Sequence, residues 1–310
     1  MHRDSEGEVI SMIKDHKKIA DRIGDWTRQY VEHATMNGVV LGLSGGIDSA
    51  LVALLCKRAG VQVFCVNMPC HSSTAAYDRA AAFASEQGLS LVKVDLTDAH
   101  AEITIQFMRG NVIGTPSSHA ALRSCLRAPT LSFFAHSLKC LIVGTGNRSE
   151  DRITRYFQKF GDGCVDFSPI ADLFKSEVYD LFKWLATEGD TKPMGPGSQA
   201  IYDAKPSADL WGPDSGQEDE KELGLTYDEI EWGDRENERT ASRYVDQYDE
   251  RGRGIIFAEI EPCDYPTWNI YSDRQREIIT KMNRLEKISR HKSNPNLPVC
   301  EVRWMVDSIE

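Results

Sequence analysis

The residues best suited to chemistry are Ser-Gly-Gly-Ile-Asp-Ser at 44–49, where an apolar run stops and a helical pattern follows. Glycines at such a turn allow close backbone approach, and the free N–H groups of the following helix attract an anion. Ser44 and Ser49 add hydroxyl donors. Asp48 makes sense beside a phosphate chiefly if a divalent cation lies between them. A simpler interpretation stays open, in which the glycines only turn the chain and Asp48 caps the helix.

The surrounding pattern indicates the elements that position this turn. An amphipathic helix is expected over residues 7–35, and four short apolar strands follow, separated by helices. Strands buried on both faces and connected by helices predict an α/β fold with a doubly wound parallel sheet. The strands are expected at 39–43, 61–68, 89–96 and 140–145, and the helices between them at 47–59, 74–87, 99–109 and 120–138.

The amino-acid composition changes after about residue 185, where glycine, proline and charged residues predict long loops. A last helix is expected at 272–292. We therefore expect a single domain over 1–310, with a core at about 8–186 and a helical, loop-rich C-terminal lid at about 187–310. The long stretches at 110–121, 188–203 and 233–270 are read as inserts.

Composition limits the partners. With 36 Lys+Arg and 47 Asp+Glu, the net charge is −11, which argues against nucleic acid or an anionic membrane as partner. We find neither an apolar run long enough to span a membrane nor a signal peptide, so a soluble, cytoplasmic protein is expected. The eight cysteines form no C-x-x-C pair and are expected to be reduced core residues.

The turn at 44–49 matches neither G-x-x-x-x-G-K-[ST] nor G-x-G-x-x-G. It resembles the PP-loop, S-G-G-x-D-S, of the ATP pyrophosphatases, which hold the pyrophosphate part of ATP and split the nucleotide between its α and β phosphates.

Further blocks narrow the resemblance. The chain reads G-T-G-N-R-S-E at 144–150, F-G-D-G-C-V-D at 160–166, P-I-A-D-L-F-K at 169–175 and P-S-A-D-L at 206–210. In order and spacing these blocks resemble the ammonia-dependent NAD synthetase family. The resemblance covers about residues 8–232 and returns at 274–292.

The resemblance implies a role for residues of each block. Asp48, Glu150 and Lys175 would be catalytic, with Asp48 and Glu150 ligating Mg²⁺ and Lys175 pairing with the phosphates. The implied ATP contacts are Gly42, Ser44, Gly45, Gly46, Ile47, Asp48, Ser49, Thr145, Lys175 and Ser207. The implied contacts to the dinucleotide substrate are Arg127, Phe157, Lys159, Asp162, Asp166, His291 and Lys292.

Taken singly, several of these residues keep a simpler interpretation. Lys175 fits a solvated helix position, Asp162 and Asp166 fit a Gly-rich turn, and His291 fits a basic cluster at a helix end. The co-occurrence of the blocks in the family's order favours the functional interpretation.

The chain departs from the family on the side of the acyl substrate. Where the family carries N-[IL]-x-A-R-x-R-M, Ala121 replaces the Asn and Cys125 replaces the first Arg, whereas Arg127 remains. A thiol cannot replace a bidentate guanidinium, so Arg123 is a candidate to compensate. Gln158 also replaces the usual Thr.

The implied activity is the adenylation of deamido-NAD by ATP, followed by amidation with ammonia to give NAD, AMP and pyrophosphate. Ammonia is expected from solution, since about 300 residues leave no room for a glutaminase or nitrilase partner domain. A homodimer is implied, with Trp26, Tyr30 and 122–138 as candidates for the interface. Three alternatives stay open: a related amide synthetase for a different carboxylic acid, a tRNA-modifying PP-loop enzyme, and a non-catalytic ATP sensor.

Overall fold

The computed structural model describes residues 13–189, 191–211, 216–241 and 268–293. Its strands form a parallel sheet in the order β3-β2-β1-β4. The chain therefore builds outward from β1 in one direction and then returns to add β4 on the other side. Ligands of such sheets bind where the strand order reverses, here beyond the carboxyl ends of β1 and β4. The strands are β1 (Val39–Gly42), β2 (Val63–Asn67), β3 (Ser90–Lys93) and β4 (Leu141–Val143).

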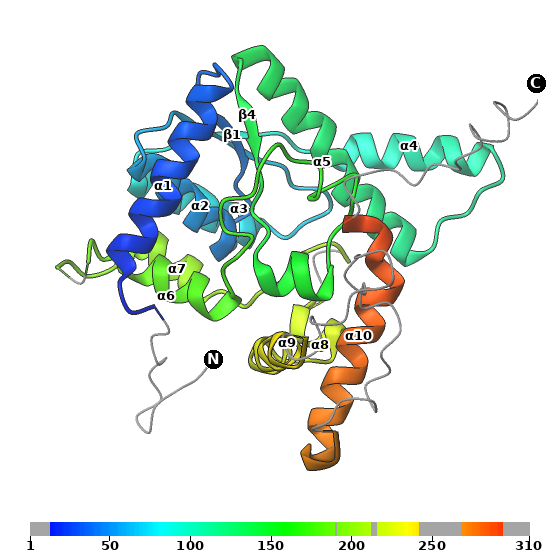
Figure 1. Cartoon of the computed structure of the whole chain (residues 1–310). Coiled ribbons are helices and arrows are strands. Elements are labelled where there is room, and N and C mark those ends of the chain that lie inside the picture. The colour runs from blue at the N-terminus through cyan, green and yellow to red at the C-terminus, as the bar shows by residue number, and fades with distance from the viewer. Residues whose placement is uncertain (1–12, 190, 212–215, 242–267, 294–310) are drawn as a thin grey trace, which may run out of the picture.

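Helices cover both faces of the sheet (Figure 1). Successive residues of β1 point to opposite faces, so Leu41 joins a core with Leu51 and Phe182, while Val40 joins a second core with Phe134. The first core lies under α1, α2, α3 and α6, and the second lies under α5. These helices and α4 are α1 (His16–His33), α2 (Ile47–Arg58), α3 (Thr74–Gln87), α4 (Thr97–Arg109), α5 (Pro116–Leu138) and α6 (Lys175–Ala186).

Part of the expected loop at 188–203 is helical, so that prediction was wrong for α7 (Pro196–Asp203). Pro196 occupies the first turn, where a missing N–H costs nothing. The Glu86 carboxylate on α3 accepts the Gly197 N–H at 2.7 Å and so caps α7 from another helix. Ile201 is fully buried. Because the cap and the burial come from α3, the local composition does not reveal this helix.

The C-terminal region packs against the segment that follows β4 (Figure 1). Ile153, Ile230 and Ile278 belong to a third buried cluster, and the guanidinium of Arg148 pairs with Asp234 at 2.6 Å. This region holds more helix than the expected long loops, because α8 and α9 also lie within it. Its elements are α8 (Asp219–Leu223), α9 (Tyr227–Ala241), a 3-10 turn (Trp268–Ile270) and α10 (Asp273–Ser293), and they pack near the π-helix η1 (Arg148–Thr154).

Several element boundaries differ from the prediction. Helix α1 begins at His16, because the Asp15 carboxylate accepts the Lys18 N–H and caps it there; the predicted residues 7–12 lie outside the described part. Much of the predicted insert at 233–270 is also outside it. Across the described ranges, we find no helix with the length and apolarity that a membrane crossing requires.

Candidate active site

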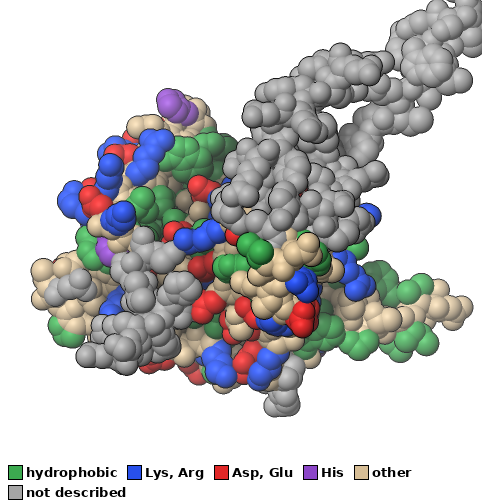
Figure 2. Space-filling view, turned by 60° about the horizontal axis from the view of Figure 1, so that its bottom comes forward, with side chains coloured by type: hydrophobic (Ala, Val, Ile, Leu, Met, Phe, Trp, Pro, Cys, Tyr) green, Lys and Arg blue, Asp and Glu red, His purple; other side chains and the backbone are tan. Residues whose placement is uncertain are grey.

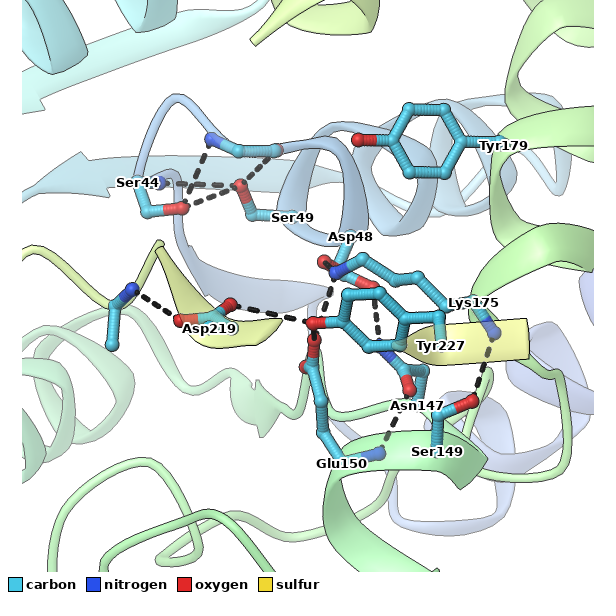
Figure 3. Close-up of polar contacts among 12 residues, drawn as sticks. Ser44, Asp48, Ser49, Asn147, Ser149, Glu150, Lys175, Tyr179, Asp219 and Tyr227 are labelled. Carbon is cyan, nitrogen blue, oxygen red and sulfur yellow. Dashed lines mark hydrogen bonds and ion pairs between the residues drawn. The ribbon is translucent and has the colours of Figure 1, made fainter. Parts of the chain in front are cut away.

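The loop between β1 and α2 has the shape of an anion cradle. Gly45 has φ = 90°, and a Cβ there would collide with the carbonyl of Ala76, so only glycine fits. The hydroxyls of Ser44 and Ser49 lie 3.1 Å apart, and the Gly46 N–H donates to Ser44 Oγ at 3.2 Å (Figure 3). Helix α2 begins after Gly46 without a side-chain cap. Its first amides are therefore not capped by a side chain and remain available to an anion.

Asp48, Glu150 and Lys175 converge from three elements at this loop (Figure 3). Lys175 Nζ lies 2.6 Å from Asp48 Oδ2 and 2.9 Å from Glu150 Oε1. Lys175 is only 2% exposed, so its interpretation as a solvated helix residue was wrong. Asp48 bonds to Lys175 rather than capping α2, so the capping interpretation was wrong as well.

Neighbouring side chains hold these groups in place. Asn147 is fully buried; its Nδ2 donates to Asp48 Oδ1 at 2.8 Å and its Oδ1 accepts the Glu150 N–H at 3.1 Å. The Tyr227 hydroxyl donates to Glu150 Oε1 at 2.6 Å. Sequence reasoning assigned no role to either residue. Asn147 had a detectable signal, because it precedes a helical turn in the G-T-G-N block, whereas Tyr227 is brought in by the C-terminal region.

The electrostatics of the cluster follow from burial. Burial would lower the pKa of Lys175, but Asp48 and Glu150 outweigh it and raise that pKa, so the ammonium stays charged. Burial also raises the pKa of Asp48 and, with Glu150 nearby, that of Asp151. Burial opposes ionisation of Glu150, but Lys175 and Tyr227 lower its pKa overall. Negative charge thus exceeds positive charge here, which suits an additional cation.

One cavity of about 430 Å³ joins most of the residues predicted from the sequence. It also contains acidic residues that the sequence analysis missed, including Asp151 and Asp219. The cavity lies beyond the ends of β1 and β4, where the strand order predicts a ligand site. The predicted residues that line it are Gly42, Ser44, Gly46, Ile47, Asp48, Ser49, Arg127, Thr145, Glu150, Asp162, Lys175 and Ser207.

Other predicted residues lie outside this cavity lining. The Asp166 carboxylate accepts the Ile142 N–H at 2.7 Å and so fixes the chain beside β4. Lys292 Nζ donates to the Phe157 carbonyl at 2.7 Å and thereby holds α10 to the loop after η1. Gly45, Phe157 and Lys159 are also absent from the lining. The side chain of His291 lies outside the described part of the chain.

The block in which Ala121 and Cys125 replace the family's residues lies on α5. It is the part of the site expected to bind the acyl substrate. Arg127 lines the cavity, with Nε 3.4 Å from the Met68 carbonyl. Asp162 Oδ1 accepts the Ser124 hydroxyl at 2.8 Å. Arg123 donates to the Leu210 carbonyl at 2.5 Å. Arg123 thus ties the P-S-A-D-L block to α5, so the residue proposed to compensate for Cys125 makes a backbone contact here.

Asp219 provides a test of the excess negative charge. It is 5% exposed, and burial together with Glu150 raises its pKa to about 6. A carboxyl whose pKa is higher in the folded chain binds more protons there, so its contribution to stability falls as the pH rises from about 4 to about 6. Asp219→Asn is expected to raise the free energy of unfolding by about 1–3 kcal/mol at about pH 7 and to have little effect at about pH 4.

Urea unfolding at the two pH values, without nucleotide or divalent cation, measures this difference. The exposed Asp203→Asn on α7 is the matched control and should change neither value. An Asp219→Asn effect that is equal at both pH values would contradict the assigned cause.

Known proteins resemble the chain over most of its length. A family model described as NAD synthase matches residues 19–235. The NH(3)-dependent NAD(+) synthetase of Archaeoglobus fulgidus is 37% identical over 248 residues, which cover 76% of this chain and 93% of that protein. The protein of the same name from Methanosarcina acetivorans is 36% identical over 221 residues, covering 69% of this chain and 79% of the other.

Solved structures share the fold. The structure of NMN synthetase from Francisella tularensis has a TM-score of 0.71 at 24% identity and covers 93% of this chain and 99% of that one. The NH3-dependent NAD synthetase from Campylobacter jejuni has a TM-score of 0.65 at 23% identity, with 93% and 100% covered. Because the family model matches more than half of the residues of this chain, the chain belongs to the NAD synthase family.

Proposed function

We propose that the chain is an ammonia-dependent NAD synthase, which adenylates the carboxylate of deamido-NAD with ATP and then amidates it with ammonia. The observation that carries this proposal is the buried Lys175, held between Asp48 and Glu150 directly beside the S-G-G-I-D-S loop. Residues from the PP-loop, G-T-G-N-R-S-E, F-G-D-G-C-V-D, P-I-A-D-L-F-K and P-S-A-D-L blocks meet in the same cavity.

In the first step a carboxylate oxygen of the substrate bonds to the α-phosphorus of ATP, and the bond from that phosphorus to the pyrophosphate oxygen breaks. The loop amides and the hydroxyls of Ser44 and Ser49 bind the departing pyrophosphate. Lys175 supplies a fixed positive charge as negative charge develops on it. In the second step ammonia bonds to the acyl carbon, the bond from that carbon to the AMP oxygen breaks, and the nitrogen loses a proton to solvent as AMP leaves.

Asp48 and Glu150 also fit a hard divalent cation such as Mg²⁺. Both offer carboxylate oxygens, the ligands that such cations prefer, and the cavity lining has six acidic residues against four basic ones. A bound Mg²⁺ would neutralise phosphate charge. With such a cation bound, Lys175 would share the carboxylates with it, and we expect the Lys175 ammonium to turn toward the phosphates when ATP binds.

Deamido-NAD is the proposed acyl substrate despite Ala121 and Cys125. The names of the relatives do not favour the alternative, an amide synthetase for another acid. We propose that Arg127 and Asp162, which line the cavity, contact the substrate there. Phe157, Lys159, Asp166, His291 and Lys292 remain proposals for its more distant parts.

A panel of carboxylic acids tests the substrate. AMP release is measured with ATP, ammonia and, in turn, deamido-NAD, its mononucleotide half and unrelated aromatic acids. We expect turnover with deamido-NAD to exceed turnover with every other acid. Turnover confined to a different acid would contradict the proposal, and so would the absence of AMP release with deamido-NAD.

The homodimer expected from the sequence is also a proposal. Phe133 on α5 is 71% exposed, and Phe107 and Met108 on α4 are 50% and 58% exposed. Figure 2 shows hydrophobic side chains along the projecting end of the molecule, the side on which Figure 1 places α4. Exposed apolar area of this kind supports the proposal of an interface here. Trp26 and Tyr30 already pack against Phe167, so they contribute less free surface.

Sedimentation tests the dimer. We expect the protein to sediment with twice the chain mass at micromolar concentration and Phe133→Glu to shift it toward the monomer, because a charge cannot be buried unpaired in an interface. Lys183→Glu, at an exposed position of α6, is the control. A monomeric wild-type protein would contradict the proposal. The lid formed by the C-terminal region and the cytoplasmic location stay predictions.

A further inference from the structure

A cysteine and two histidines meet at the end of β2, outside the lining of the cavity. One ligand atom from each of Cys70, His71 and His100 lies within 4.8 Å of the others. Cys70 is fully buried and His100 is 4% exposed. Cys70 and His71 belong to the loop after β2, whereas His100 belongs to α4. No step of the proposed reaction uses these side chains.

We infer that Cys70, His71 and His100 bind a transition-metal ion of the Zn²⁺ type. A thiolate with two imidazoles is the donor set that suits Zn²⁺ or Co²⁺ rather than Mg²⁺. This site differs from the proposed Mg²⁺ site, whose donors are the carboxylates of Asp48 and Glu150.

The spacing of the donor atoms agrees with one shared ion. His71 Nε2 and His100 Nδ1 lie 3.1 Å apart. Two imidazole nitrogens on one tetrahedral Zn²⁺ are separated by about 3.3 Å, and a nitrogen and a sulfur by about 3.6 Å, as bond lengths of about 2.0–2.1 and 2.3 Å require. The imidazoles thus need to move by only a few tenths of an ångström, and the thiol by somewhat more.

The two ring nitrogens that face each other, His71 Nε2 and His100 Nδ1, form a hydrogen bond that an ion bound to both would replace. Nε2 of His100 is buried and has no hydrogen-bond partner of normal geometry, although the backbone of His119 is near enough to affect the pKa of the ring. Burial lowers the pKa of both His71 and His100, so both rings are neutral and offer a lone pair. The Cys70 Sγ donates weakly to the Leu96 carbonyl at 3.7 Å; on binding, the thiol proton leaves to solvent as the metal–sulfur bond forms.

The backbone directs these side chains toward one another. His71 has φ = 54°, a left-handed conformation that is unfavourable for a non-glycine residue, and its N–H donates to Thr97 Oγ1 at 3.1 Å. The ring of His119 on α5 lies with its centroid 5.4 Å from that of His100. The His119 imidazole is therefore close enough to be the fourth ligand of a tetrahedral ion. If it does not bind, a water molecule would be the fourth ligand.

An ion here would link the loop after β2 to α4. The same loop continues into Ser72 and Ser73, which line the cavity, and the Cys70 N–H donates to Ser72 Oγ at 3.4 Å. We therefore assign the ion a structural role, in which it stabilises one wall of the ATP cavity and takes no part in the reaction.

Cobalt binding tests the site directly. The full-length protein is stripped with a chelator and titrated with Co²⁺ in excess Mg²⁺, which occupies carboxylate sites. We expect one Co²⁺ per chain, with a thiolate-to-cobalt charge-transfer band and intense visible bands of tetrahedral Co²⁺. Zn²⁺ should displace Co²⁺ and so remove these absorption bands. It should also raise the midpoint temperature of thermal unfolding of the stripped protein.

Two variants, each with a matched control, distinguish the loss of a metal ligand from a general destabilisation of the fold. Cys70→Ser should abolish the charge-transfer band, whereas Cys140→Ser should keep it; Cys140 is a buried cysteine whose Sγ likewise donates to a backbone carbonyl, at 3.6 Å. Asparagine tolerates the left-handed backbone conformation of residue 71, so His71→Asn should fold normally. Because it removes one imidazole ligand, it should weaken Co²⁺ binding at least tenfold. His136→Gln, on α5, is its control.

A titration without a thiolate band, or equal Co²⁺ binding by the wild-type protein and His71→Asn, would overturn the inference. These spectra do not depend on turnover, so they are independent of the proposed NAD synthase activity. In the presence of Mg²⁺, AMP release by the Cys70→Ser protein should stay within a few-fold of wild type; complete loss with a native fold would contradict the structural role.

Discussion

Asp48→Asn is expected to lower kcat by at least about 10²-fold, because it removes one of the two carboxylates proposed to hold the cation at the phosphates. The amide has nearly the same shape, and its oxygen can still accept the Asn147 N–H that now reaches Asp48 Oδ1. The fold should therefore persist. Steady-state kinetics of AMP release measure the effect, with thermal unfolding as the check on folding.

The matched control is Asp98→Asn. Asp98 also lies in the first turn of a helix, α4, but is exposed and does not line the cavity. Its kcat should stay within about twofold of wild type, since substitutions at exposed sites away from such features are nearly neutral. Near-normal kcat in Asp48→Asn would remove this residue from the catalytic machinery.

Lys175→Met is expected to lower the free energy of unfolding by about 3–5 kcal/mol and to abolish most turnover. The substitution keeps the length of the side chain but leaves Asp48 and Glu150 buried without their cation. Without the ammonium, the pKa of each carboxylate rises, so the loss of stability should shrink as the pH falls and both groups become protonated.

Urea unfolding at neutral and acidic pH measures the Lys175→Met effect. Lys183→Met, on the exposed side of the same helix α6, should change stability by less than about 0.5 kcal/mol. A Lys175→Met protein as stable as this control would contradict the buried ion cluster. Added Mg²⁺ should restore part of the lost stability if the carboxylates bind it.

The central part of the fold could be predicted because its signals are local. The apolar strand at β1, the two glycines and the start of α2 are adjacent in the sequence, and close backbone approach at Gly45 requires glycine. The position of Lys175 could be predicted only through the resemblance, since nothing in the residues around it indicates that its side chain is buried.

Other features depend on contacts between distant segments. Helix α7 begins where Glu86 caps it, 111 residues earlier in the chain, and Tyr227 reaches Glu150 over 77 residues. The metal site that we infer joins Cys70 and His71 to His100, so no short spacing such as C-x-x-C reveals it. The cysteines were expected to be core residues. Cys56, Cys65, Cys70 and Cys140 are buried, but Cys125 is only partly buried and Cys164 is exposed, so the prediction was wrong for these two. Cys263 and Cys300 lie outside the described residues.

Isotope tracing tests the central claim most directly. Deamido-NAD labelled with a heavy oxygen isotope in its carboxylate is incubated with ATP, ammonia and the protein, and the nucleotides and phosphates are analysed by mass spectrometry. We expect AMP that carries one labelled oxygen, together with unlabelled pyrophosphate, because the carboxylate attacks the α-phosphorus. ADP with labelled inorganic phosphate would contradict it.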